Sequence, residues 1–208
     1  MVFEDRLDAA SQLARALGKF RGKNPLVLAI PRGAVPMGRA LADALEGDFD
    51  VVLVRKLGSP GNPEFAVGAV DEAGWTYVAD YADEVGASRA YLADETATQL
   101  ATMRVRRTLY TPARPPIDPA GRIAIVVDDG IATGATMIAA LHSVRARHPK
   151  RLVCAVPVGS RDSIERVRGH ADELVCLDSP AGFGAVSEFY RAFPQVDDKD
   201  VIAALGKR

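Results

Sequence analysis

The segment 123–136, which reads IAIVVDDGIATGAT, constrains this chain more than any other feature. Its first five residues are apolar, which is typical of a strand buried on both faces of a sheet. Asp128 and Asp129 follow at the carboxyl end of that strand, where ligands bind in open α/β sheets. Small residues, apart from Ile131, then form a loop that leads into a helix. The segment therefore predicts a parallel sheet with a ligand site at its carboxyl edge.

The loop after the two aspartates has the composition of a phosphate site. Small residues let backbone N–H groups approach an anion, and the following helix N-terminus favours negative charge. Adjacent carboxylates suit the vicinal hydroxyls of a sugar or a hydrated magnesium ion. Together they indicate a ribose 5-phosphate, with an acidic strand end before a capped helix as the alternative. The expected phosphate-binding residues are Gly130, Ile131, Ala132, Thr133, Gly134, Ala135 and Thr136.

The sequence lacks two other motifs that bind nucleotide phosphates. A P-loop needs a lysine that this loop lacks. A dinucleotide fingerprint needs G-x-G-x-x-G directly after the first strand, and that spacing does not occur here.

The rest of the chain alternates between strand and helix patterns. Apolar runs predict strands at 26–30, 50–54, 66–70, 76–78, 122–127, 151–156 and 173–177. Helices are predicted at 3–17, 36–45, 89–110, 135–147, 163–168 and 199–205, with Ser88 as the N-cap of the third. The glycine- and proline-rich stretch 57–65 predicts a mobile loop. This alternation favours one α/β domain over 1–208, with a mostly parallel sheet and a peripheral subdomain built from the two chain ends.

Composition narrows the function classes. The formal net charge of −1 lacks the basic excess of a nucleic-acid-binding protein. Two cysteines within apolar runs and three scattered histidines do not form a zinc motif. The first residues lack the apolar core of a signal peptide, and no window has the length of a membrane span. We therefore expect a cytoplasmic protein that binds neither nucleic acid nor membrane.

The sequence VVDDGIATGAT resembles the 5-phosphoribosyl-1-pyrophosphate (PRPP) signature of the type I phosphoribosyltransferases. The resemblance implies that Asp128 and Asp129 hold the ribose 2- and 3-hydroxyls, and that the following loop wraps the 5-phosphate. The motifs PRG, VRKLGSPGNPE and VCLDSP extend it over nearly the whole chain, towards a bacterial subgroup of that family. The implied fold is α/β, with helices flanking the sheet and a small hood.

The resemblance also implies a pyrophosphate site. Family members bind pyrophosphate just after the first strand, often beside a non-proline cis peptide, and Pro31, Arg32 and Gly33 occupy that position. Arg55 and Lys56 precede the stretch where the family has a flexible hood loop with basic residues. A plain turn at the first segment and a solvated strand end at the second are the alternatives.

The implied reaction is displacement of pyrophosphate from PRPP by a nitrogen of a base. Asp128, Asp129, Arg32 and Lys56 are the expected catalytic residues. Mg²⁺ is the expected cofactor; it would bind through PRPP, with Asp128 and Asp129 as candidate direct ligands. The resemblance is compatible with a homodimer.

The sequence says less about the residues that would bind the base than about any other part of the expected site. Phe183, in the loop AGFGA, is the best candidate for stacking on a base, whereas helical spacing places Phe189 and Phe193 in the core. Asp178 and Glu64 are candidates for the edge of the base, and Trp75 is a weaker one. These residues do not determine which base accepts the ribose.

Two other functions are compatible with the same residues. A non-catalytic PRPP-binding regulator would keep the ribose phosphate site, but Arg32, Arg55 and Lys56 favour catalysis because they suit a leaving group. A phosphosugar hydrolase would need a general base, and no histidine lies next to the proposed loops.

Overall fold

The computed structural model describes residues 1–110, 112 and 115–206. A five-stranded parallel sheet with the order β2-β1-β6-β7-β8 forms its centre. These strands are β1 (Leu26–Ala29), β2 (Asp48–Val51), β6 (Ile123–Val127), β7 (Arg151–Val158) and β8 (Glu173–Asp178). The mostly parallel α/β sheet predicted from the strand and helix alternation is confirmed.

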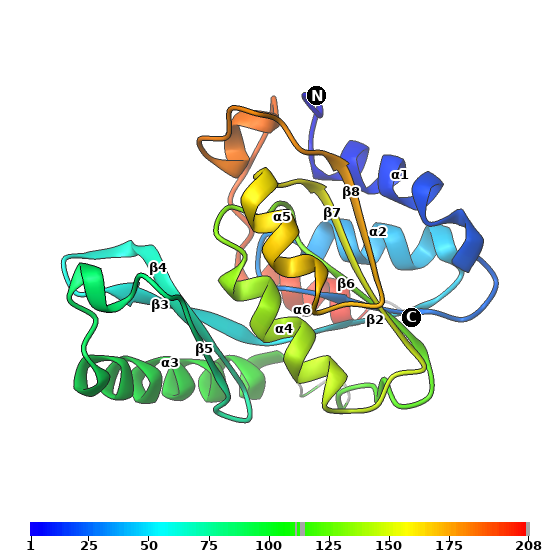
Figure 1. The fold of residues 1–208 in the computed structure, drawn as a ribbon. Helices are drawn as coiled ribbons and strands as arrows, with labels where there is room; N and C mark the ends of the chain where they lie inside the picture. The colour runs from blue at the N-terminus through cyan, green and yellow to red at the C-terminus, as the bar shows by residue number, and fades with distance from the viewer. Residues whose placement is uncertain (111, 113–114, 207–208) are drawn as a thin grey trace.

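Helices cover both faces of this sheet (Figure 1). They are α1 (Arg6–Ala16), α2 (Val35–Leu45), α4 (Ala135–Arg145), α5 (Arg161–Arg168) and α6 (Asp198–Gly206), with short 3₁₀ turns at Gly18–Phe20, Asp83–Val85 and Val186–Phe189. Side chains alternate across β1: Val27 and Ala29 join the core beneath α1 and α2, whereas Leu26 and Leu28 join the core beneath α4. This double burial explains why the central strands are apolar at every position.

A second, antiparallel sheet with the order β3-β4-β5 projects from the central sheet together with the long helix α3 (Figure 1). Its elements are β3 (Val54–Ser59), β4 (Asn62–Asp71), β5 (Thr76–Val78) and α3 (Arg89–Tyr110). The Ser88 hydroxyl accepts a hydrogen bond from the Tyr91 N–H at 3.2 Å, so Ser88 caps α3 as predicted. Residues 54–110 thus form a unit beside the carboxyl edge of the parallel sheet.

The prediction that 57–65 is a loop without regular structure is wrong, because these residues form the turn end of a β-hairpin. Its mobility stays a prediction. Leu57 pairs with Gly68 and Ser59 pairs with Asn62, and the register shifts on either side of Gly58. Glycine is needed there, since a Cβ on Gly58 would lie 2.6 Å from the carbonyl oxygen of Pro63. Pro63 lies at this irregularity, where a missing N–H does not break a regular ladder.

The strand predicted at 50–54 also differs from the structure. It divides between two sheets, because β2 ends at Val51 and Val54 already begins β3. Segments near the two ends of the chain pair with each other, through a parallel bridge between Phe3 and Tyr190. The peripheral subdomain built from these ends and the single domain over 1–208 stay predictions.

Among the described residues, no helix combines the length and apolar character needed to cross a bilayer.

We predict that Gly38→Ala destabilises the protein. A Cβ on Gly38 would lie 2.7 Å from the Ala29 Cβ and 2.9 Å from the Phe49 ring, where α2 crosses the sheet. Overpacking of this kind costs about 1–3 kcal/mol and should lower Tm by about 2–8 °C. Gly169→Ala is the matched control, because Gly169 has helical backbone angles and no atom lies within 4 Å of its added Cβ. Equal Tm values for the two variants would contradict the prediction.

Candidate active site

The predicted phosphate loop lies between β6 and α4, and its carbonyl groups are held from behind. The hydroxyls of Ser160 and Ser163 donate to the carbonyl of Ala132 at 3.2 and 2.6 Å, and the Arg166 guanidinium donates to that of Thr133 at 2.7 Å. A peptide C=O points opposite to the N–H of the next residue, so these bonds turn two N–H groups away from α5. No protein acceptor within the described residues takes the N–H groups of 132–136. The loop therefore has the donors that an anion needs.

A cavity of about 230 Å³ lies in front of this loop. It is lined by Gly130, Ile131, Ala132, Thr133, Gly134, Thr136, Asp128, Lys56, Glu64 and Val186, among others. Two members of the predicted loop contribute less. Ile131 is buried, and its N–H donates to the Val158 carbonyl at 2.9 Å. It lines the cavity, but its N–H is not available to an anion. Ala135 is buried beneath the loop and is not part of the lining.

Lys56 and Arg55, predicted to act together, lie on opposite faces of β3. Lys56 lines the cavity, with its Nζ 2.6 Å from Glu64 Oε2. Arg55 points towards α3, where its Nε donates to Gln99 Oε1 at 2.7 Å. Burial lowers the pKa of Arg55, and the positive charges of Arg106 and Arg32 lower it further. The alternation of side chains along a strand separates the two residues.

The segment after β1 has the cis peptide that the resemblance suggested, between Pro31 and Arg32. The side chain of Arg32 is directed to α6, with Nη1 3.7 Å from Asp198 Oδ2. Arg32 therefore lies with Arg55 and Asp198, outside the lining of the cavity that holds Lys56. Binding of pyrophosphate by Pro31, Arg32 and Gly33 stays a prediction.

The two aspartates after β6 have different surroundings. Asp129 accepts two hydrogen bonds on Oδ2, from Nε and Nη2 of Arg6 at 3.1 and 3.0 Å. Arg6 is itself fixed, because its Nη1 donates to the Pro194 carbonyl at 2.6 Å and its guanidinium lies 3.7 Å from the centre of the Phe193 ring. Asp128 lines the cavity instead, and its Oδ1 accepts from the Asp129 N–H at 2.9 Å. Asp128 is thus the aspartate that faces the cavity.

Gly33 links the predicted pyrophosphate segment to this pair. A Cβ on Gly33 would lie 2.3 Å from Asp129 Oδ2 and 3.3 Å from the Arg6 guanidinium. Tyr190 adds a third contact, since its hydroxyl donates to the Asp129 carbonyl at 2.6 Å. Asp129 therefore joins α1, the segment after β1 and the C-terminal tail.

Electrostatics separate the aspartates further. Burial raises the pKa of Asp128 well above its ordinary value, and the neighbouring charge of Asp129 raises it more. Burial also raises the pKa of Asp129, but Arg6 opposes that effect. Ionised Asp128 therefore lowers the stability of the unliganded protein. A partner such as a hydroxyl or a cation would offset this effect.

The predicted base-binding residues do not gather in the cavity. Phe183 packs on Phe189, with ring centroids 5.2 Å apart, and Asp178 pairs with the amino group of Met1. Glu64 is at the cavity, but it is strongly exposed and its hydrogen bond with Lys56 lowers its pKa. Base binding by Phe183, Asp178 and Glu64 stays a prediction. Phe189 and Phe193 are half-buried against the core, as their spacing suggested.

Arg6 was not identified as a site residue from the sequence, although its position in the first helix indicates a buried partner. Arg6 lies at helical spacing between Phe3 and Ala10 on the buried stripe of α1, and it is 7 % exposed. Leu7, which the apolar pattern placed on that stripe, is 55 % exposed. A charged residue on a buried helical stripe indicates a buried partner. Here the partner is Asp129.

The fold and the site together define a class of protein: an α/β protein with an acidic strand end and a loop of unpaired N–H groups at the carboxyl edge of its sheet. The family model described as "Phosphoribosyl transferase domain" matches residues 5–192. The chain therefore belongs to the phosphoribosyl transferase domain family.

Similar proteins agree with this membership. The chain is 43 % identical over 209 residues to "Putative phosphoribosyl transferase Rv0571c" and to "Putative phosphoribosyl transferase MT0597", from two strains of Mycobacterium tuberculosis. These matches cover 99 % of the chain but 47 % of each relative, so the chain spans about half the length of the curated relatives it matches. The crystal structure of TT1426 from Thermus thermophilus is 45 % identical, covers 99 % of this chain and 98 % of its own, and superimposes with a TM-score of 0.83.

We predict that Arg6→Ala destabilises the protein by about 3 kcal/mol, because it leaves Asp129 without its partner in a buried setting. Adding Asp129→Asn should recover about 1–2 kcal/mol, since the unpaired charge is then removed. Urea unfolding measures both variants. Arg21→Ala, which breaks the exposed pair with Glu46, should cost less than about 1 kcal/mol. Strictly additive effects of the two substitutions would show that Arg6 and Asp129 do not interact.

We predict that Asp128→Asn stabilises the unliganded protein at neutral pH by about 1 kcal/mol or more. The raised folded-state pKa means that the carboxyl contributes stability while protonated and loses it as pH rises through that pKa. The advantage of the variant should therefore shrink as pH falls towards about 3.9, the ordinary pKa of aspartate. Thermal unfolding between pH 4 and 8 tests this, with the exposed Asp162→Asn as control. An advantage that grows on acidification would contradict it.

Proposed function

We propose that this protein transfers ribose 5-phosphate from PRPP to a nitrogen of a heterocyclic base and releases pyrophosphate. One observation carries the proposal: the cavity places the Asp128 carboxylate beside a loop whose N–H groups are free to bind an anion. Family membership and the arrangement of Lys56 at the same cavity support it.

The 5-phosphate would bind the loop 132–136 through its N–H groups and the hydroxyls of Thr133 and Thr136. Asp128 would then accept hydrogen bonds from the ribose hydroxyls. Asp129 would not contact the sugar; Arg6 holds its carboxylate, and its N–H orients Asp128. This division of labour refines the equal roles that the sequence suggested for the two residues.

The transition state carries positive charge on the ribose ring and growing negative charge on the leaving pyrophosphate. Catalysis of such a step depends on positioning and electrostatics, not on a covalent nucleophile. The Asp128 carboxylate would offset the charge on the ring. Lys56 would bind the leaving group after exchanging Glu64 for phosphate oxygens. Arg32 and Arg55 form a second positive group that we assign to the distal phosphate.

Magnesium is compatible with the side chains present. Asp128 has a hard carboxylate oxygen at the cavity, whereas that of Asp129 is bound by Arg6. This fits an ion that prefers phosphate and water oxygens and needs few protein ligands. Mg²⁺ would neutralise charge on the pyrophosphate, and Asp128 would be its protein contact.

The β3–β4 hairpin would cover the reacting atoms. Lys56 and Glu64 both project from it to the cavity, so a movement of the hairpin would close or open the site. Closure excludes water, which otherwise competes with the base as acceptor. Phe183, at the tail beside the sheet edge, remains our candidate for packing on the base. The homodimer and the cytoplasmic location likewise remain proposals.

The proposal predicts base-dependent pyrophosphate release from PRPP and Mg²⁺, measured across a panel of purines, pyrimidines and other nitrogen heterocycles. Asp128→Asn should lower kcat/KM by about 100-fold or more, because it removes the carboxylate that faces the ribose. Lys56→Ala should act mainly on the leaving group and lower kcat by about 10-fold or more. Asp162→Asn and Lys150→Ala, which are exposed and outside the cavity, are the matched controls.

Two outcomes would contradict the proposal. Calorimetric binding of PRPP without pyrophosphate release for any base would indicate a regulator that senses PRPP. Absence of PRPP binding would overturn the assignment of the cavity itself.

A further inference from the structure

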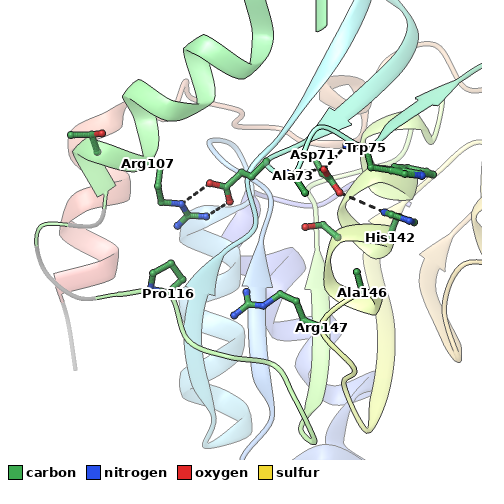
Figure 2. Close-up of a pocket in the computed structure, with 11 residues that line it drawn as sticks. Asp71, Ala73, Trp75, Arg107, Pro116, His142, Ala146 and Arg147 are labelled. Atoms are coloured by element: carbon green, nitrogen blue, oxygen red, sulfur yellow. Dashed lines mark hydrogen bonds and ion pairs between the residues drawn. The ribbon is translucent and has the colours of Figure 1, made fainter. Parts of the chain in front are cut away.

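A second pocket, of about 730 Å³, lies at the opposite end of α4 from the phosphate loop (Figure 2). It is formed by the turn between β4 and β5, the end of α3, the C-terminal end of α4 and Pro116. Its volume is within the range of small-molecule sites, about 300–1,000 Å³. His142, which lines this pocket, follows Thr136 of the active-site cavity by six residues of α4, or about 9 Å along the helix axis.

The two acidic side chains of this pocket both have partners of their own. Glu72 accepts two hydrogen bonds from Arg107, one of them at 2.8 Å (Figure 2). Asp71 is buried: its Oδ1 accepts from the N–H groups of Ala73 and Trp75 at 2.9 Å each, and its Oδ2 faces His142. Both carboxylates are therefore held by groups of the protein itself, at the β4–β5 turn and on α3 and α4.

An aromatic pair forms one wall. The rings of Trp75 and His142 are stacked, with centroids 3.6 Å apart and planes within 10°. The Nδ1 atom of His142 is buried and has no hydrogen-bond partner among the described residues, since Asp71 Oδ2 lies 3.5 Å away. The wall thus offers planar apolar surface, while the unpaired Nδ1 atom is buried behind it and faces Asp71.

A cation with spare hydrogen-bond donors lies on another side. Arg147 bonds only through Nη2 within the described chain, to the Ile117 carbonyl at 3.3 Å and Asp118 Oδ1 at 3.4 Å. Both contacts are long, and its side chain is 43 % exposed. A guanidinium has five N–H donors, so Nε and Nη1 can bind a carboxylate or phosphate. Figure 2 shows the Arg147 guanidinium below Arg107 and the Asp71–His142 pair.

We propose that this pocket binds a planar aromatic molecule carrying one anionic group, with the ring against the Trp75–His142 wall and the anion on Arg147. The shared chemistry covers an aromatic carboxylate and a nucleoside monophosphate. The site uses no residue of the active-site cavity, so it does not depend on the proposed transferase activity.

The chain supplies its own reporter, because Trp75 is its sole tryptophan. Emission from this tryptophan is followed while the full chain is titrated with AMP, adenosine, benzoate, benzamide and inorganic phosphate. AMP and adenosine differ in the phosphate, and benzoate and benzamide differ in charge. A saturable change with AMP or with benzoate, at least about tenfold tighter than with its neutral counterpart, is the expected result, and the responding member identifies the anion.

Variants locate the response. Arg147→Ala should weaken binding of the anionic ligand about tenfold, whereas Arg168→Ala, an exposed arginine on α5 outside the pocket, should not change it. Asp128→Asn should leave the response intact, because it alters only the active-site cavity. No saturable change with any probe, an unchanged affinity in Arg147→Ala, or loss of the response in Asp128→Asn would each overturn the proposal. Pyrophosphate release is not used as a readout, so failure of this site and failure of the transferase remain distinguishable.

Discussion

The interaction between Arg6 and Asp129 connects segments of the structure that are far apart in the sequence. It joins the first helix to the end of the central strand, and Arg6 also bonds the carbonyl of Pro194 in the C-terminal tail. Gly33 is compatible with the pair only because it has no side chain. The position of the site-facing Asp128 follows from this arrangement, since the N–H of Asp129 is its hydrogen-bond donor. Segments from both ends of the chain therefore support the acidic strand end.

The site also depends on a division of labour between two sheets. The parallel sheet supplies the rigid part: the end of β6, the loop before α4 and the contacts from α5 that orient the loop carbonyls. The antiparallel hairpin supplies Lys56 and Glu64, which lie at the same cavity but on a projecting element. Under the proposed function, the loop before α4 would hold one phosphate while the hairpin meets the group that leaves.

The sequence predicted the central elements well because each carries a local signal. The apolar run of β6, the alternation of strands with helices and the capping residue Ser88 depend on neighbouring residues alone. The prediction for 57–65 failed because it also used neighbouring residues alone. The glycines and prolines of this stretch indicate a loop, but Gly58 is required where two paired strands approach closely. That requirement arises from pairing with Pro63 and later residues of β4, which no local pattern reveals.

The sequence by itself therefore determined the fold class and the order of strand, acidic pair, small-residue loop and helix over 123–136, because these elements are contiguous in the chain. Only the tertiary structure decided which aspartate faces the cavity, because the partner of Asp129 lies 123 residues away in α1. It also separated Arg55 from Lys56, since adjacent residues of a strand point to opposite faces. The position of a charged side chain in a site depends on packing between distant segments. The small residues and hydroxyl groups of the loop are, in contrast, consecutive in the sequence and can be identified from it.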